Sequence, residues 1–171
     1  MIHIYYGDGK GKTTAAIGLA VRAAGSRMKV LFVQFLKTEF SGERHTLSHT
    51  ENITLTFAPV DLKFTYDMDE TEKQKAAQLF RKIFDDAVTR VLTQGFDMIV
   101  LDEVSTAVEA GMLSEHELYE FVSNVPKNIE VVMTGHNPPE RILELADYVT
   151  EMKKIKHPYD KGVQARFGIE F

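Results

Sequence analysis

Residues 5–16 read YYGDGKGKTTAA, and the prediction of the fold rests on this stretch. A short apolar strand, residues 2–6, comes before it, and an alanine-rich helix over residues 13–24 is expected after it. A glycine-rich turn that opens a helix directs backbone N–H groups, and the positive end of the helix dipole, at one point. The stretch therefore predicts a phosphate-binding loop. A plain glycine-rich turn is the alternative, which the position of Gly-Lys-Thr-Thr between strand and helix disfavours.

The loop is one residue shorter than the usual phosphate-binding pattern. That pattern is a glycine, four residues and then Gly-Lys-Ser/Thr. Here residues 11–13 close the motif, but Tyr6 stands where the first glycine is expected, and Gly7 follows it.

The residue types of the loop predict how it binds a nucleotide. Lys12 can reach phosphate oxygens, Lys10 adds a second positive charge, and both are predicted catalytic residues. The hydroxyl of Thr13 is typical of a Mg²⁺ ligand. The predicted nucleotide-binding residues of the loop are Gly7, Asp8, Gly9, Lys10, Gly11, Lys12, Thr13 and Thr14.

A second motif, DMIVLDEV at residues 97–104, is an apolar strand that ends in an acidic pair. A carboxylate at such a strand end holds Mg²⁺ directly or through a water molecule. Asp102 and Glu103 are therefore predicted, with Thr13, to hold magnesium. The two motifs together predict Mg-nucleotide binding. They leave the reaction open, because Glu103 can also activate water, as in an ATPase.

The composition limits the kind of protein. The chain has 171 residues, of which 44% are hydrophobic, and residues 1–171 are expected to form one domain. No run approaches about 18 consecutive apolar residues, and the first residues lack a basic-then-apolar signal, so a cytoplasmic protein is expected. The net charge of −5 argues against a nucleic-acid partner. The absence of cysteine excludes disulfides, thiolate metal sites and cysteine nucleophiles.

Strands and helices alternate along the sequence. Apolar segments predict strands at residues 2–6, 30–36, 53–57, 98–101, 129–133 and 148–152. Helical patterns cover residues 13–24, 69–94, 114–125 and 138–146, while residues 37–50 read as a loop or a short helix. This alternation predicts an α/β fold in which helices cover both faces of a mostly parallel sheet, with ligands at the carboxyl ends of the strands.

Segments in matching order and spacing relate nearly the whole chain to a known family. They include GDGKGKTTAAIGLAVRAAG (7–25), VQFLK (33–37), GER (42–44), FTYD (64–67), DMIVLDEV (97–104), TGHNPPE (134–140) and LADYVTEM (145–152). In these segments the chain resembles the ATP:corrinoid adenosyltransferases of the BtuR/CobO/CobP type, which share the one-residue-short glycine loop. The resemblance implies a three-layer, RecA-like P-loop nucleoside triphosphatase fold and a homodimer.

The resemblance also implies a reaction. The family transfers the 5′-deoxyadenosyl group of ATP to the cobalt of a reduced corrinoid, releases triphosphate, and serves adenosylcobalamin synthesis or salvage. It implies Mg²⁺ with ATP as co-substrate, cob(I)alamin or a corrinoid precursor as substrate, and an external reductant protein or flavin. It implies no nucleic-acid or membrane partner. It further implies that ATP lies reversed, with its terminal phosphate in the loop.

Three further residues take roles from the resemblance. Arg22 matches a family arginine near the nucleotide, and a solvated helix arginine is the alternative. Phe64 and Tyr66 stand where the family reads Phe-Thr-Trp, whose aromatics crowd the lower face of the corrin and favour a cobalt without its lower ligand. Loop packing is the alternative for this pair. Longer members carry a helical extension before the first strand, which helps to cover the corrinoid, so a corrinoid site that is more open or built differently is expected here.

Two other functions stay open at this point. One is a P-loop ATPase or nucleotide kinase, and the other is a non-catalytic protein that binds a corrinoid or ATP. The products distinguish the three, because transfer yields triphosphate, ATPase or kinase action yields diphosphate, and a carrier yields neither. His45 and His49 have the i, i+4 spacing of metal ligands, but with no third ligand evident nearby they are interpreted as a solvated pair.

Overall fold

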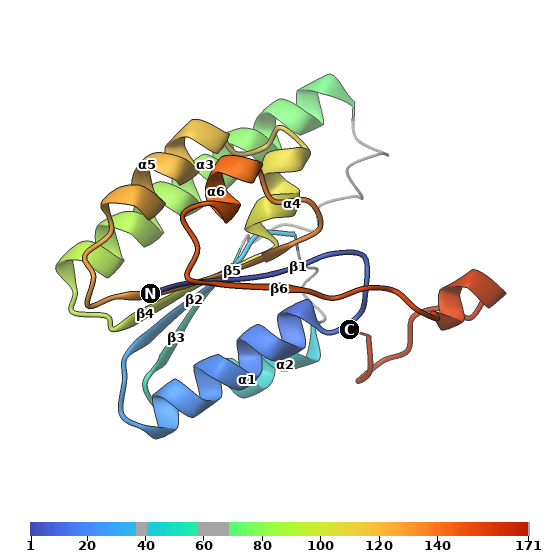
Figure 1. Cartoon of the computed structure of the whole chain (residues 1–171), viewed down its shortest axis with the longest axis horizontal. Helices are drawn as coiled ribbons and strands as arrows, with labels where there is room; N and C mark the ends of the chain where they lie inside the picture. Colours follow the sequence, from blue (N-terminus) through green and yellow to red (C-terminus); the bar gives the residue numbers. More distant parts are fainter. Residues whose placement is uncertain (37–40, 58–68, 171) are drawn as a thin grey trace.

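The computed structural model describes residues 1–36, 41–57 and 69–170. Within them, six strands form one sheet in the order β3-β2-β4-β5-β1-β6, and every neighbouring pair is parallel (Figure 1). The strands are β1 (Ile2–Tyr6), β2 (Val30–Gln34), β3 (Ile53–Phe57), β4 (Met98–Asp102), β5 (Glu130–Gly135) and β6 (Tyr148–Glu151). All carboxyl ends therefore lie at the same edge of the sheet.

Helices cover both faces of this sheet (Figure 1). One face carries α1 (Lys12–Gly25) and α2 (Gly42–Ser48). The other carries α3 (Glu70–Thr93), α4 (Val104–Glu109), α5 (Glu115–Asn124) and α6 (Glu140–Leu143). A 3₁₀ helix, η2 (Pro158–Lys161), lies in the segment after β6. The predicted three-layer α/β architecture is confirmed.

Local signals explain where the longest helix begins. The side chain of Asp69 accepts a hydrogen bond from the backbone N–H of Glu72 (2.8 Å), and the Glu72 side chain accepts one from the backbone N–H of Asp69 (3.0 Å). This reciprocal pair is a capping box, which satisfies two of the N–H groups that a helix start leaves without partners. The predicted helix over residues 69–94 thus agrees with α3.

Two helices differ from the expectation. No helix was predicted at α4, because six residues are too few to establish a helical period. The helix predicted over residues 138–146 is only four residues long, with Pro139 at its N-cap position. The polar segment 37–50, read as a loop or a short helix, contains α2 in its described part.

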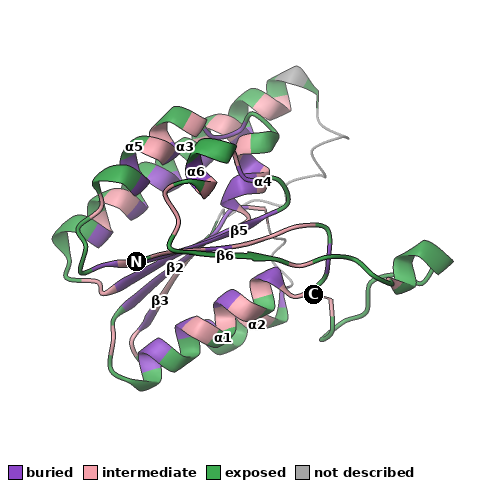
Figure 2. Cartoon of the chain, viewed as in Figure 1, coloured by how far each residue is buried: buried purple, intermediate pink, exposed green. Residues whose placement is uncertain are grey.

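The core lies between the sheet and the two helical layers. All five residues of β2 and of β4 are buried, and Figure 2 shows the central strands enclosed while the outer helix surfaces are exposed. Strands buried on both faces are typical of parallel sheets, which explains why β2 and β4 are apolar up to their last residues, Gln34 and Asp102. No helix in the described part of the chain is long and apolar enough to cross a membrane. The fold thus brings the glycine loop after β1 and the acidic pair after β4 to one edge.

Candidate active site

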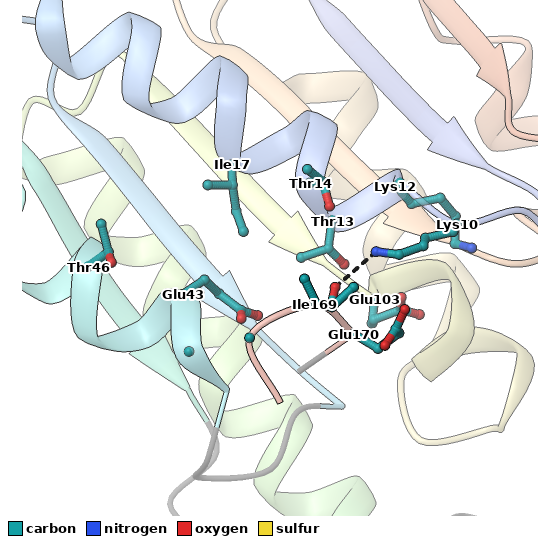
Figure 3. A pocket seen from close by; sticks show the side chains of 13 residues that line it. Lys10, Lys12, Thr13, Thr14, Ile17, Glu43, Thr46, Glu103, Ile169 and Glu170 are labelled. Atoms are coloured by element: carbon teal, nitrogen blue, oxygen red, sulfur yellow. Dashed lines mark hydrogen bonds between the residues drawn. The ribbon is translucent and has the colours of Figure 1, made fainter. Parts of the chain in front are cut away.

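A pocket of about 570 Å³ lies at the carboxyl edge of the sheet, beside the glycine loop (Figure 3). Four segments that are distant in sequence line it. They are the loop and the first turns of α1 (residues 10–14 and Ile17), α2 (Gly42, Glu43 and Thr46), Glu103 after β4, and residues 168–170. The predicted loop residues from Lys10 to Thr14 therefore do form a cavity wall.

The first half of the loop packs against the chain that follows β6. The backbone N–H of Gly9 donates to the carbonyl oxygen of Met152 at 2.6 Å. A Cβ atom added at Gly7 or at Gly9 would lie 2.6 Å from this same oxygen, and Gly7 also has a φ of +111°. Only glycine fits such a position without moving the backbone. Gly7 and Gly9 thus shape the loop and do not line the pocket.

Asp8 ties the loop to the same segment. Its carboxylate accepts a hydrogen bond from the backbone N–H of Lys154 at 2.9 Å. This bond holds the pKa of Asp8 below its usual value, because the N–H stabilises the ionised form. The side chain of Asp8 thus anchors the loop to residue 154, and binding of the nucleotide by Asp8 stays a prediction.

The two lysines of the loop reach its cavity side (Figure 3). Lys12 is only 8% exposed, and its Nζ donates to the carbonyl oxygen of Gly9 at 2.9 Å. The Nζ of Lys10 donates to the carbonyl oxygen of Ile169 at 2.9 Å. A phosphate oxygen is a charged acceptor and forms a stronger hydrogen bond with an ammonium group than a neutral carbonyl does. Both lysines can therefore exchange these carbonyl partners for phosphate.

The acidic pair divides into one buried and one pocket-lining carboxylate. Asp102 is fully buried, and its two oxygens accept hydrogen bonds from the Thr134 hydroxyl (2.8 Å) and from the Gln34 amide (3.2 Å). Glu103 lines the pocket and accepts from the Thr106 hydroxyl at 2.6 Å. Of the predicted magnesium ligands, the structure thus places Thr13 and Glu103 at the pocket and Asp102 in the layer beneath it.

A sharp turn of the backbone at Glu103 lets the Asp102 side chain stay buried while the Glu103 side chain lines the pocket. Glu103 has a φ of +62°, a left-handed conformation that is uncommon for a residue with a side chain. Its N–H donates to the Thr134 hydroxyl at 2.8 Å, which supports the turn. Strained residues of this kind gather at functional sites, where the surrounding structure holds them in place.

A third carboxylate, Glu43 of α2, lines the pocket and was not predicted as a site residue. Its Oε1 accepts hydrogen bonds from the Ser41 hydroxyl (2.7 Å) and the Gln34 amide (3.1 Å). The sequence signal for this cluster was Gln34, a polar residue that closes the otherwise apolar strand β2 at the carboxyl edge. Such a buried amide needs polar partners nearby.

The end of the chain also reaches the pocket, which the sequence did not indicate. Residues 168–170 line it on the side of Lys10 (Figure 3). Arg166 donates to the Glu170 carboxylate, with Nη2 and Oε1 3.0 Å apart. The hydrogen bonds from Arg166 lower the pKa of Glu170 to about 2, so this carboxylate remains ionised.

The family was identified by comparison with known proteins. The family model described as "ATP:corrinoid adenosyltransferase BtuR/CobO/CobP" matches residues 1–171. The chain belongs to this family. The corrinoid adenosyltransferase of Escherichia coli K12 is 37% identical over 172 residues, which covers 100% of this chain and 85% of that protein. Corrinoid adenosyltransferase CobA of Salmonella typhimurium is 34% identical over 172 residues, which also covers 100% of this chain and 85% of that protein.

Membership of the corrinoid adenosyltransferases confirms the predicted function. The chain is an enzyme of the transferase class that uses ATP to adenosylate corrinoids. The comparisons give no support to the ATPase, kinase or carrier alternatives. Among solved structures, a KaiC-like protein of Pyrococcus horikoshii superimposes with a TM-score of 0.52 at 14% identity, covering 89% of this chain and 71% of that one. This likeness bears on the fold alone and agrees with the predicted RecA-like P-loop architecture.

Other residues predicted from the adenosyltransferase family lie away from the pocket or outside the described part. Arg22 is exposed in the last turn of α1 and does not line the pocket. Phe64 and Tyr66 lie outside the described residues. The rings of His45, in α2, and of His49, just after it, are 4.6 Å apart, and both residues are exposed. Within the described ranges, no group of three or more His, Asp or Glu side chains is arranged to hold a metal ion.

Proposed function

We propose that this enzyme transfers the 5′-deoxyadenosyl group of ATP to the cobalt of a reduced corrinoid and releases the triphosphate whole. One observation carries the proposal: the short glycine loop of an adenosyltransferase forms the cationic wall of a pocket that Lys10 and Lys12 both reach. In this reaction the bond between C5′ of ribose and the α-phosphate oxygen breaks, and a cobalt–carbon bond forms. The electron pair of the broken bond stays on the triphosphate.

The loop residues stabilise that leaving group. Negative charge grows on the bridging oxygen as the carbon–oxygen bond breaks, and fixed donors aimed at this charge lower the barrier. The terminal phosphate of ATP occupies the loop, so Lys12, Lys10 and the backbone N–H groups at the start of α1 act on the far end of the triphosphate, over which part of the new charge is spread. The reacting carbon then lies away from the loop, where a corrinoid can approach it. In this proposal Thr14 binds phosphate beside Thr13, while the role of Arg22 near the nucleotide stays a prediction from the family resemblance, because Arg22 does not line the pocket.

Absorbance spectroscopy tests the transfer itself. Anaerobic incubation of the enzyme with ATP, Mg²⁺ and chemically reduced cobalamin is expected to produce the spectrum of a cobalt–carbon bond, in proportion to the ATP consumed. Omission of ATP or of the enzyme serves as the control. ATP consumption without any change of the corrinoid spectrum would show that the chain is an ATPase.

Magnesium is part of the proposal. The pocket offers the oxygen ligands that Mg²⁺ prefers, the hydroxyl of Thr13 and the carboxylate of Glu103, on facing segments of its wall. When bound with ATP, the ion supplies positive charge to the phosphate oxygens. Asp102 lies beneath Glu103 and acts on the site through Thr134, which hydrogen-bonds both the Asp102 carboxylate and the Glu103 backbone.

Magnesium titrations of two variants test these roles. Glu103→Gln and Asp102→Asn remove one negative charge each at nearly constant volume. Each variant is expected to need about tenfold or more Mg²⁺ for half-maximal activity, the usual effect of changing a ligand or its supporting partner. Glu109→Gln is the control, because Glu109 is an exposed carboxylate bonded to Asn137 outside the pocket. Unchanged titrations in both variants would mean that the acidic pair merely ends a strand.

The corrinoid side of the reaction is assigned to Phe64 and Tyr66. In the proposal their rings crowd the lower face of the corrin and keep the cobalt without its lower ligand, which eases the reduction of cob(II) to cob(I). An external reductant protein or flavin supplies the electron. Chemically prepared cob(I)alamin already lacks a lower ligand, so it bypasses the step that these rings assist.

Comparison of two cobalt states tests the pair. Phe64→Ala and Tyr66→Ala are each expected to lose roughly tenfold in rate from cob(II)alamin with a weak reductant, about 1.4 kcal/mol of barrier, and far less from cob(I)alamin. Tyr66→Trp retains an aromatic face and is expected to stay active in both assays. Equal losses from the two cobalt states would instead indicate loop packing or weaker binding.

We also propose a homodimer that works in the cytoplasm. The family resemblance supports it, and so does the edge strand β6, where Tyr148 and Val149 are 51% and 48% exposed. An exposed edge strand with apolar side chains is a surface that proteins normally cover. Light scattering of the purified protein is expected to give twice the chain mass of 19.4 kDa; a mass of one chain would contradict the dimer.

A further inference from the structure

Two threonine hydroxyls hold Glu103 at the carboxyl edge of the sheet. Thr134, on β5, accepts a hydrogen bond from the Glu103 backbone N–H at 2.8 Å and donates to the Asp102 carboxylate at 2.8 Å. Thr106, three residues further along in α4, donates from its hydroxyl to Glu103 Oε2 at 2.6 Å. Thr134 therefore supports the left-handed backbone of Glu103, whereas Thr106 fixes the direction of its side chain.

The hydroxyl of Thr106 is itself oriented by the end of β5. The backbone N–H of His136 donates to Thr106 Oγ1 at 3.2 Å, and a hydroxyl that accepts this bond still has its one hydrogen to donate. This hydrogen is donated to a carboxylate, and hydrogen bonds to ionised groups are stronger than those between neutral groups. The carbonyl oxygen of His136 accepts the N–H of Gly7 at 3.1 Å. The backbone of His136 thus connects the glycine loop, through Thr106, to the Glu103 carboxylate.

Gly135 allows α4 to approach β5 closely enough for this contact. It has a φ of +154°, and a Cβ atom added there would lie 2.6 Å from Ser105 Cβ and 2.8 Å from the backbone nitrogen of Thr106. Only glycine fits this position without moving α4. The place of Thr106 is therefore fixed by the packing of α4 on β5.

We propose that Thr106 is a positioning residue that directs the Glu103 carboxylate toward the Mg²⁺ ion bound with ATP. The inference rests on the proposed function, in which Glu103 and Thr13 hold this ion. Thr106 does not line the pocket, so its hydroxyl acts on the ion only through Glu103. Hydrogen-bond partners behind a metal ligand typically change metal affinity by about 10- to 100-fold, although they do not touch the metal.

The coordination geometry of Mg²⁺ makes the direction of the carboxylate important. The ion requires nearly octahedral coordination, with oxygen atoms at about 2.0–2.1 Å. A Glu103 side chain that rotates freely meets this requirement in only part of its orientations. The bond from Thr106 to Oε2 restricts that rotation before the ion arrives, so less conformational entropy is lost on binding.

ATP binding with and without the metal tests the role of Thr106. The dissociation constant of ATP is measured by calorimetry without a corrinoid, once with Mg²⁺ and once with EDTA, and the ratio of the two gives the gain in affinity from the metal. Thr106→Val removes the hydroxyl and retains the branched shape. It is expected to lower this gain by about tenfold, while ATP affinity in EDTA stays within about threefold of the wild type. Thr106→Ser retains the hydroxyl and is expected to keep the wild-type gain.

Two further comparisons separate positioning from stability. Thr93→Val removes a hydroxyl that donates to the Thr89 carbonyl oxygen within α3, outside the pocket, and is expected to leave the gain unchanged. In a Glu103→Ala background, Thr106→Val is expected to have no further effect, because a residue that acts through Glu103 then has nothing to position. Equal losses in both backgrounds would overturn the proposal. So would a loss of ATP affinity in EDTA as large as the loss with Mg²⁺.

The same titrations distinguish failure of this inference from failure of the proposed function. If Mg²⁺ raises the ATP affinity of the wild type and Thr106→Val keeps the full gain, the magnesium site stands and the role of Thr106 is wrong. If Mg²⁺ does not raise the ATP affinity of the wild type and transfer proceeds without it, the proposed magnesium role and this inference are both wrong. A gain that is lost in Thr106→Val and retained in Thr106→Ser supports the inference even when no transfer is observed.

Discussion

Lys12→Ala is expected to lower the rate of adenosyl transfer by about 10²- to 10⁴-fold at saturating ATP. The Lys12 ammonium group is buried in the loop, and in the proposed complex it binds the terminal phosphate of the leaving triphosphate. Removing one partner of a buried charge pair costs roughly 3–5 kcal/mol, and this range gives the stated factor if the loss falls on the transition state. Single-turnover measurements with cob(I)alamin report the rate of this step.

The matched control for Lys12 is Lys127→Ala. Lys127 is exposed between α5 and β5, outside the pocket, so its removal changes the net charge equally without touching the site. The control is expected to transfer at the wild-type rate. If the transfer rate of Lys12→Ala is within about threefold of the wild-type rate, a difference of less than 1 kcal/mol in the barrier, Lys12 does not take part in the transfer step.

Gly9→Ala is expected to destabilise the protein and to weaken ATP binding together. The added Cβ would lie 2.6 Å from the carbonyl oxygen of Met152 and 2.9 Å from the carbonyl carbon of Lys153, both backbone atoms. Relief of this overlap must lengthen the hydrogen bond from Gly9 N–H to Met152 O. Overpacking and a lost hydrogen bond together cost roughly 2–4 kcal/mol. For a chain of this size we expect a melting temperature lower by on the order of 5–15 °C.

Gly18→Ala is the matched control for Gly9. Gly18 lies inside α1, and a Cβ added there meets no atom within 4 Å. Alanine is the better helix former by about 1 kcal/mol, so this variant is expected to be slightly more stable and fully active. Thermal unfolding and ATP titration of both variants give the comparison. Wild-type stability in Gly9→Ala would show that the loop does not pack against the segment after β6.

Local sequence patterns predicted the frame of the site. Two motifs are recognised from residues that are adjacent in the sequence: the glycine loop between β1 and α1, and the apolar run that ends at Asp102. Both could therefore be located without a structure. The rule that parallel strands end at one edge then brought them together. The division of the acidic pair could not be predicted, because it depends on the left-handed backbone at Glu103 and on Thr134 from another strand.

The rest of the site depends on contacts between distant segments. Glu43 lies in a polar stretch without an apolar period. Its position at the pocket depends on a hydrogen bond from Gln34, which β2 places beside Asp102. Residues 168–170 reach the pocket through a hydrogen bond between Lys10 and Ile169, which are 159 positions apart. No local pattern encodes such a contact. The anchoring role of Asp8 likewise depends on the backbone of Lys154.

Identification of the phosphate product tests most directly that ATP is attacked at C5′ while its triphosphate lies in the glycine loop. The enzyme is incubated anaerobically with ATP, Mg²⁺ and cob(I)alamin, and the products are quantified by phosphorus NMR and by corrinoid absorbance. We predict one triphosphate for each cobalt–carbon bond formed, with no diphosphate above the enzyme-free control. Diphosphate with phosphate, formed without adenosylated corrinoid, would contradict the account, because it would place the attack at the terminal phosphate.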